Sequence, residues 1–181
     1  LIFVRDHLQG FYANKTVEAE GQTISATLGY SAENFHSLAR FVAETLQSLD
    51  VAEHKLLFIY KYHLFGLALE DMIRNAVDAA GLSGSGPFDL VQPDTGMHIL
   101  LGGLSDFSNG QDVVLVAGNE IGDVLLEALI HYYRLGTKET IYNLNTAYFD
   151  TDNKIEVLQT MHGSADDIAG KELLNPFATL R

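Results

Sequence analysis

Four short apolar runs recur along the chain, and much of the sequence between them has the periodicity of helices. The runs cover residues 1–4, 56–60, 88–91 and 113–117. Each has the length and the apolar, β-branched or aromatic composition of a strand that is buried on both faces. This alternation of strand-like and helix-like segments predicts an α/β fold.

Three helices are predicted from apolar spacing and end signals. Ser31 is a suitable N-cap for a helix that continues through residue 49. A second helix covers residues 67–80 and ends at Gly81, and a third covers residues 122–133.

The remaining segments have weaker signals. Residues 13–30 are polar and β-branched around a central glycine, which is typical of an exposed hairpin. Residues 81–87 are predicted to be a flexible connection. Residues 137–161 are predicted to be irregular, apart from one strand at residues 155–158.

The composition bounds the size and the chemistry of the protein. The 181 residues suit one domain, or one domain with part of another, and 47% are hydrophobic, which suffices for a sizeable core. No cysteine is present, so a disulfide, a thiolate metal site and a cysteine nucleophile are excluded. The net charge of −13 argues against a nucleic-acid partner and is compatible with a bound divalent cation.

Membrane and secretion signals do not occur in these residues. No apolar run reaches the length of a membrane span, and the first residues lack the pattern of a signal peptide. We therefore expect no membrane partner and a cytoplasmic protein, or a protein of the mitochondrial matrix in a eukaryote. The first residue is Leu1 rather than methionine, so we expect a fragment or a processed product.

A turn rich in small residues is the most specific motif. Residues 162–171 read HGSADDIAGK, and Asn175-Pro176 follows. Small residues let backbone N–H groups approach a ligand closely, and Asp167 offers an acceptor to a diol such as a ribose. A short turn of this kind is more often a plain surface turn, but a string of this length favours a nucleotide site.

Four sequence blocks resemble one enzyme family. HGSADDIAGK…NP is similar to the adenosine-binding loop of the isocitrate and isopropylmalate dehydrogenases, the β-decarboxylating dehydrogenases, which typically reads HGSAPDIAGK…NP. Asp166 replaces the proline of the family. Upstream, in the order of the family, residues 4–12 resemble VRENTEGxY, residues 58–61 lie where a catalytic lysine ends a strand, and residues 118–127 resemble GNxxGDxLSD.

The resemblance implies an isocitrate/isopropylmalate dehydrogenase-like fold in two parts. Residues 1–134 would form mainly the small dimerisation domain, with the substrate and metal residues and an arm at residues 13–30 that pairs with the partner subunit. Residues 135–181 would form part of the large nucleotide-binding domain. The implied protein is a homodimer that uses NAD and Mg²⁺ or Mn²⁺ to oxidise and decarboxylate a 2-hydroxy acid with a β-carboxylate.

The catalytic and metal-binding roles of the family fall on chemically suitable residues. Arg5 would bind a substrate carboxylate by two parallel hydrogen bonds, and Tyr12 would deliver a proton to the enolate carbon. Lys61 would move the hydroxyl proton, because burial at a strand end lowers the pKa of a lysine. Asp123 and Glu127 would bind metal from one helix face. From the residues alone, surface side chains, a strand-end lysine and a charged helix start remain the plainer alternatives.

The third metal carboxylate departs from the family pattern. The pattern VDxxxMxL aligns with residues 92–99 through Met97, and the expected aspartate falls on Pro93. Asp94 comes one residue later. On a strand this shift turns a side chain to the opposite face, so either the loop adjusts or the ligand is lost. In the family this carboxylate and the lysine reach into the active site of the partner, which makes the dimer part of the chemistry.

The resemblance also assigns the cofactor-binding residues. They are His162, Gly163, Ser164, Ala165, Asp167 and Asn175. An acidic residue beside the adenosine ribose accepts a hydrogen bond from the 2′-hydroxyl group and repels a 2′-phosphate. Asp167 therefore favours NAD over NADP.

Two hypotheses for the function follow. The first is the enzyme described above, and the second is a catalytically inactive, shortened paralogue that acts as a dimeric binding or scaffold protein. Residues 1–181 contain neither the GDGIGPE-type loop of the family nor its SxxxRxxxxxxR helix, and together with Pro93 this favours the second hypothesis for the chain itself. The HGSA loop and the GD…E pair favour the first hypothesis for a longer parent.

Overall fold

The computed structural model describes residues 1–10, 17–21, 23–133, 145–150, 155–160 and 170–171. The chain divides into two compact units, Leu1–Leu129 and Ile130–Arg181. The assignment of residues 1–134 and 135–181 to dimerisation and nucleotide-binding domains stays a prediction.

A four-stranded parallel sheet forms the centre of the first unit, with the strand order β1-β6-β4-β5. Its strands are β1 (Ile2–Arg5), β4 (His54–Ile59), β5 (Asp89–Val91) and β6 (Asp112–Ala117). β6 is central and pairs with β1 from Ile2↔Val114 and with β4 from His54↔Asp112. The four apolar runs predicted to be strands are therefore confirmed, and the fold is α/β.

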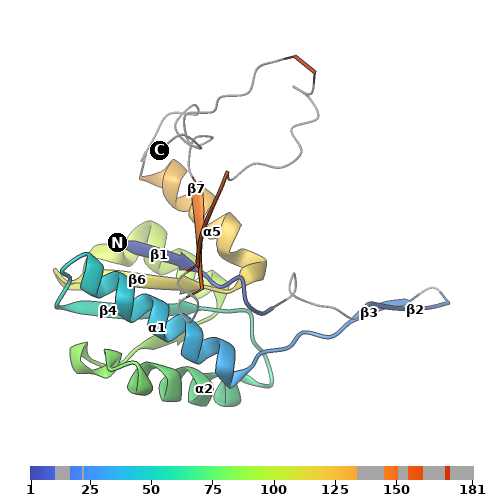
Figure 1. The fold of residues 1–181 in the computed structure, drawn as a ribbon, viewed down its shortest axis with the longest axis horizontal. Helices are drawn as coiled ribbons and strands as arrows, with labels where there is room; N and C mark the ends of the chain where they lie inside the picture. The colour runs from blue at the N-terminus through green and yellow to red at the C-terminus, as the bar shows by residue number, and fades with distance from the viewer. Residues whose placement is uncertain (11–16, 22, 134–144, 151–154, 161–169, 172–181) are drawn as a thin grey trace. The chain divides into compact units, whose positions relative to one another are not determined.

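Helices cover both faces of this sheet (Figure 1). The face that carries Phe58 and Val116 packs against α1 (Ala32–Ser48) and α2 (Gly66–Ala79). The face that carries Ile59 and Leu115 packs against α5 (Asn119–Tyr132) and the helical segment after β5. That segment comprises α3 (Pro93–His98), a π-helical turn η3 (Ile99–Gly103) and α4 (Leu104–Ser108). Alternate residues of each strand thus enter two different cores, which explains why the strands are apolar throughout.

The end signals of the first two helices are confirmed. The side chain of Ser31 accepts a hydrogen bond of 3.2 Å from the Asn34 amide and caps α1. Gly81 has a φ of 72°, in the left-handed region that favours glycine, and directly follows the C-cap of α2. The start of the third helix was predicted three residues too late. The backbone carbonyl of Gly118 already accepts from the Gly122 amide, so the helix begins at Asn119.

Two further predictions need correction, and a helical segment after β5 was not predicted. The segment 81–87 contains a short 3₁₀-helix, η2 (Leu82–Ser85), rather than only a flexible connection. The segment after β5 is helical, and Pro93 occupies its first turn, where proline is favoured. The region 137–161 holds two strands, β7 (Asn145–Asp150) and β8 (Ile155–Thr160), which pair antiparallel.

The hairpin predicted at residues 13–30 is confirmed by β2 (Val17–Glu20) and β3 (Thr23–Ala26), which pair antiparallel. Whether it pairs with a second subunit stays a prediction. Among the described residues, no helix has both the length and the apolar character needed to cross a membrane.

Candidate functional site

Most of the predicted substrate and metal residues that the structure describes follow the carboxyl ends of the parallel strands. Arg5 is the last residue of β1, and Lys61 follows β4 by two residues. Asp94 follows β5 within α3, and Asp123 follows β6 within α5. Because parallel strands end at the same edge of a sheet, the fold brings four separate sequence blocks to one side of the molecule, which is where ligands bind in open α/β sheets.

The guanidinium group of Arg5 is held by the start of α5. Its Nη2 atom donates to the backbone carbonyl of Asn119 at 2.9 Å and to the Asn119 side chain at 3.2 Å, and Nε donates to the same carbonyl at 3.3 Å. The carboxylate of Asp123 lies 3.7 Å from Nη2. The Nε–Nη2 edge of the guanidinium group is therefore engaged by Asn119.

Gly122 gives Arg5 the space for this position. A Cβ atom at residue 122 would lie 2.5 Å from Cγ and 2.8 Å from Cδ of Arg5. The glycine that precedes Asp123 in the GD motif is thus required by the packing of the arginine from a distant block. Two blocks that are separate in sequence fit together through direct contact.

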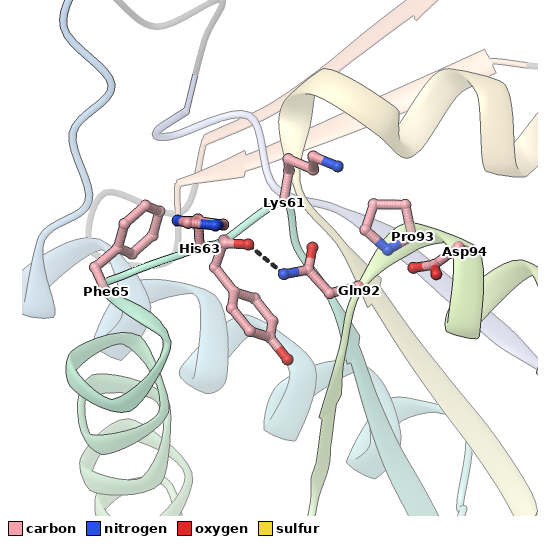
Figure 2. Close-up of a pocket in the computed structure, with 7 residues that line it drawn as sticks. Lys61, His63, Phe65, Gln92, Pro93 and Asp94 are labelled. Atoms are coloured by element: carbon pink, nitrogen blue, oxygen red, sulfur yellow. Dashed lines mark hydrogen bonds between the residues drawn. The ribbon is translucent and has the colours of Figure 1, made fainter.

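A pocket of about 630 Å³ contains the predicted lysine and the displaced aspartate. Its lining residues are Lys61, Tyr62, His63, Phe65, Gln92, Pro93 and Asp94. Figure 2 shows that the side-chain amide of Gln92 donates to the backbone carbonyl of Tyr62, which ties the ends of β4 and β5 together. Lys61 is exposed, so the burial expected at this strand end is absent in the single chain.

The helix that begins at Pro93 determines the position of Asp94, the candidate for the third metal carboxylate. Asp94 lies in the first turn of α3 and is exposed. Strand geometry does not apply to Asp94, because successive residues of a helix differ by about 100° rather than 180°. Asp94 therefore stays at the sheet edge, in the pocket that it shares with Lys61. Whether Asp94 replaces the expected metal ligand stays a prediction.

The two remaining metal candidates lie one helical turn apart on α5. Asp123 and Glu127 are both exposed, and the spacing of four residues places them on one face of the helix. Within the described part of one chain, no group of three histidine, aspartate or glutamate side chains is arranged to hold a metal ion. A metal at Asp123 and Glu127 would need at least one ligand from outside this set or from solvent.

A buried polar network, which was not predicted from the sequence, lies next to these residues. Asp6 is only 1% exposed, and it accepts hydrogen bonds from the Tyr60 hydroxyl at 2.8 Å, from Nε2 of Gln9 at 2.9 Å and from the Leu8 amide at 2.9 Å. Burial raises the pKa of Asp6, while the hydrogen bonds from Gln9 and Tyr60 act in the opposite direction. An acidic residue directly after an apolar strand is the signal that could have revealed it.

A second hydrogen-bonded pair extends the network to α5. The Tyr30 hydroxyl donates to Oε1 of Glu120 at 3.1 Å. Burial and the Glu120 carboxylate together raise the pKa of Tyr30. Gly10 has a φ of 94°, and a Cβ atom there would lie 2.7 Å from Oε2 of Glu120, so glycine is required at this point of the motif. Burial and the nearby Arg5 charge lower the pKa of His7.

The other predicted site residues lie outside the described residues. They are Tyr12, His162, Gly163, Ser164, Ala165, Asp167 and Asn175. Their roles in proton transfer and in NAD binding stay predictions.

Comparison with known proteins gives similarity in structure only. No protein-family model and no curated protein matches the sequence. The TT0538 protein from Thermus thermophilus is similar over 98% of this chain and 33% of its own, with a TM-score of 0.69 and 20% identity. An isocitrate dehydrogenase from Methylococcus capsulatus is similar over 98% of this chain and 50% of its own, with a TM-score of 0.67 and 19% identity.

A β-decarboxylating dehydrogenase from Thermococcus kodakarensis is similar over 91% of this chain and 45% of its own, with a TM-score of 0.60 and 19% identity. The chain spans between a third and a half of the length of these three structures. At this level of identity the likeness establishes the fold, which is isocitrate/isopropylmalate dehydrogenase-like.

Proposed function

We propose that these residues belong to an NAD-dependent dehydrogenase that uses Mg²⁺ or Mn²⁺ to oxidise and decarboxylate a 2-hydroxy acid with a β-carboxylate. The observation that carries the proposal is the contact between two motif blocks, in which Arg5 packs on Gly122 and pairs with Asp123. The fold supports it, because isocitrate dehydrogenase and a β-decarboxylating dehydrogenase are among the similar structures.

Each described residue has a role that suits its position. Arg5 would bind a carboxylate of the substrate through the guanidinium edge that Asn119 leaves open. Lys61 would exchange a proton with the 2-hydroxyl group. Tyr12, which lies outside the described residues, would protonate the carbon that loses carbon dioxide. Asp123 and Glu127 fit a hard divalent cation through their exposed carboxylates, and such an ion, when bound, would polarise the 2-hydroxyl group.

The proposed enzyme is a homodimer that shares its active sites. Lys61 and Asp94 line one pocket, which would face the Arg5 and Asp123 groups of the second subunit. Two large apolar side chains beside this pocket, Leu64 and Leu67, are 93% and 81% exposed, and a partner chain would cover them. Association would also bury Lys61, which supplies the desolvation that the single chain lacks.

Reduction of NAD by the full product of the gene that encodes these residues tests the proposal. Absorbance of NADH should rise when isocitrate or isopropylmalate is added with Mg²⁺, and NADP should be used less well because of Asp167. A mixture of two inactive variants, Lys61→Ala and Asp123→Asn, should regain activity, because a mixed dimer contains one intact site. No reduction of NAD with any of these acids would refute the proposal.

The alternative is a dimeric binding or scaffold protein without turnover. The observations in its favour are Pro93 in place of the expected aspartate and the lack of a three-residue metal cluster within the described residues. A full gene product that dimerises, and that binds a hydroxy acid or a nucleotide without reducing NAD, would support this alternative.

A further inference from the structure

Two hydrogen-bonded side chains adjoin the proposed ligand-binding residues. Tyr60 immediately precedes Lys61, and Asp6 immediately follows Arg5. The Tyr60 hydroxyl donates to Oδ2 of Asp6 at 2.8 Å, and both residues are at most 1% exposed. One buried contact therefore joins the neighbours of the two cationic residues of the proposed site.

This contact links two strands that are not paired with each other. In the sheet, β6 lies between β1 and β4. Past the strand ends, the Asp6 amide donates to the carbonyl of Ala117 at 2.8 Å, and the Gly118 amide donates to the carbonyl of Ile59 at 2.9 Å. Each of these bonds reaches only the central strand. The Tyr60–Asp6 bond, by contrast, crosses the end of β6 and connects the residue after β1 to the residue after β4.

Side-chain alternation places this contact on the face opposite the groups that would meet a ligand. Tyr60 packs in the core between the sheet and the helices α1 and α2, and Asp6 meets it there. Arg5 is on the other face, where α5 holds it. Continued alternation directs Lys61 to the same face as Arg5.

The bond is costly to break, because it satisfies a buried carboxylate. Gln9 and Leu8 supply the other two donors to Asp6, and Gln9 also accepts from the Ser31 amide at the start of α1. Loss of one donor leaves part of the charge of Asp6 buried without a partner. The position of each strand end is thus restrained by the other.

We propose that Asp6 and Tyr60 are positioning residues, which hold the strand end that carries Arg5 in a fixed relation to the strand end that carries Lys61. In the homodimer proposed above, these two cations serve different active sites, so the pair links the two sites through the body of one subunit. The part that concerns hydroxy-acid binding rests on the proposed function, whereas the link between the strand ends does not.

Amide hydrogen exchange, followed by NMR on the whole chain, tests the link itself. Tyr60→Phe keeps the buried ring and removes only the hydroxyl group. The reporter is the Leu8 amide, which donates to Asp6 at the end of β1. In Tyr60→Phe it should exchange about tenfold faster than the loss of global stability explains, because one hydrogen bond to a charged group is lost. Val42→Ala calibrates the change in global stability, because Val42 is in the same core but seven residues along α1 from Phe35, whose ring contacts that of Tyr60. Equal exchange of Leu8 in the two variants, after this correction, would overturn the proposal.

Calorimetric titration of the full gene product with isocitrate and with isopropylmalate, each in the presence of Mg²⁺, tests the consequence for ligand binding. If the wild-type protein binds one of these acids, Tyr60→Phe should weaken binding about tenfold, on the same hydrogen-bond energy, and Val42→Ala should not. Equal affinity in all three proteins would refute a positioning role. If neither isocitrate nor isopropylmalate binds to the wild-type protein, the proposed function fails, and amide exchange alone decides whether the strand ends are coupled.

Discussion

At the scale of single residues, the charged groups at the sheet edge are oriented by the protein itself. Arg5 is fixed by the start of α5, and the carboxylate of Asp6 is satisfied by three donors in a buried site. Such contacts reduce the conformational freedom that a ligand would otherwise have to remove on binding. Asp6 and Tyr60, the residues next to Arg5 and Lys61 in sequence, are therefore the residues through which we propose that the two strand ends are held.

Burial of Asp6 gives the stability of the chain a defined dependence on pH. The pKa of Asp6 in the folded chain is raised above its ordinary value of 3.8, so between these two values the folded state holds a proton that the unfolded state has released. The contribution of Asp6 to stability is therefore complete below pH 3.8 and is lost as the pH rises through the folded pKa. Urea unfolding of the wild type and of Asp6→Asn over this pH range should show that the free energy of unfolding of the wild type, relative to that of Asp6→Asn, falls as the pH rises. A difference that grows with pH would contradict the burial of an ionisable Asp6.

Substitution of Gly122 tests the contact between the two motif blocks. Gly122→Ala would place a methyl group against the side chain of Arg5, and such overpacking costs about 1–3 kcal/mol, against a gain of about 1 kcal/mol in helix propensity. We expect a net loss of stability and weaker binding of any carboxylate at Arg5. Gly102→Ala is the matched control, because nothing lies within 4 Å of a Cβ atom there. Equal effects of the two substitutions would show that Arg5 does not depend on Gly122.

At the scale of elements, the segment that joins β1 to α1, which contains the β2–β3 hairpin, has a side-chain hydrogen bond to a backbone amide at each end. Asp6 accepts from the Leu8 amide at the start, and Ser31 caps α1 at the end. Ser31→Ala should lower the free energy of unfolding by about 1 kcal/mol, the usual cost of losing an N-cap. Ser48→Ala, at the other end of the same helix, should change it by a few tenths of a kcal/mol at most, because its hydroxyl group is exposed. Chemical denaturation of both variants measures this, and a neutral Ser31→Ala would mean that the cap is dispensable.

The elements that have a clear apolar pattern or clear end signals in the sequence could be predicted. The four sheet strands are buried on both faces, and α1 and α2 have clear apolar spacing and end signals, so their positions follow from the sequence. The segment after β5 could not be predicted in the same way. Its helix starts at Pro93, and proline is typical of the first turn of a helix. This signal was overlooked because the segment was aligned with a family pattern that was treated as a strand. β7 was missed because only residues 147–149 in it are apolar or aromatic, and polar residues precede and follow them.

Within the candidate site, only residues whose own side-chain chemistry suggests a role could be predicted. The positions of Arg5, Asp94 and Asp123 at one sheet edge follow from the strands that precede them. The Tyr60–Asp6 bond could not be predicted, because it joins residues 54 apart whose significance depends on strand order. A tyrosine at the end of an apolar strand is, on sequence alone, simply a member of the core.

At the scale of the whole molecule, the negative net charge of the protein opposes the binding of an anionic ligand. The net charge of −13 repels an anionic substrate, so Arg5, Lys61 and a divalent cation would have to offset it locally. The cation and the hydroxy acid should therefore bind cooperatively, each weakly without the other.

Titration of the full gene product with isocitrate and with isopropylmalate, in the presence and absence of Mg²⁺, tests the central claim most directly. Binding of one of these acids should require Mg²⁺ and should be lost in Asp123→Asn, whereas Asp106→Asn, an exposed aspartate of α4, should bind as the wild type does. Heat of binding that is the same with and without Mg²⁺, or that persists in Asp123→Asn, would contradict the assignment of this sheet edge as a metal-dependent hydroxy-acid site.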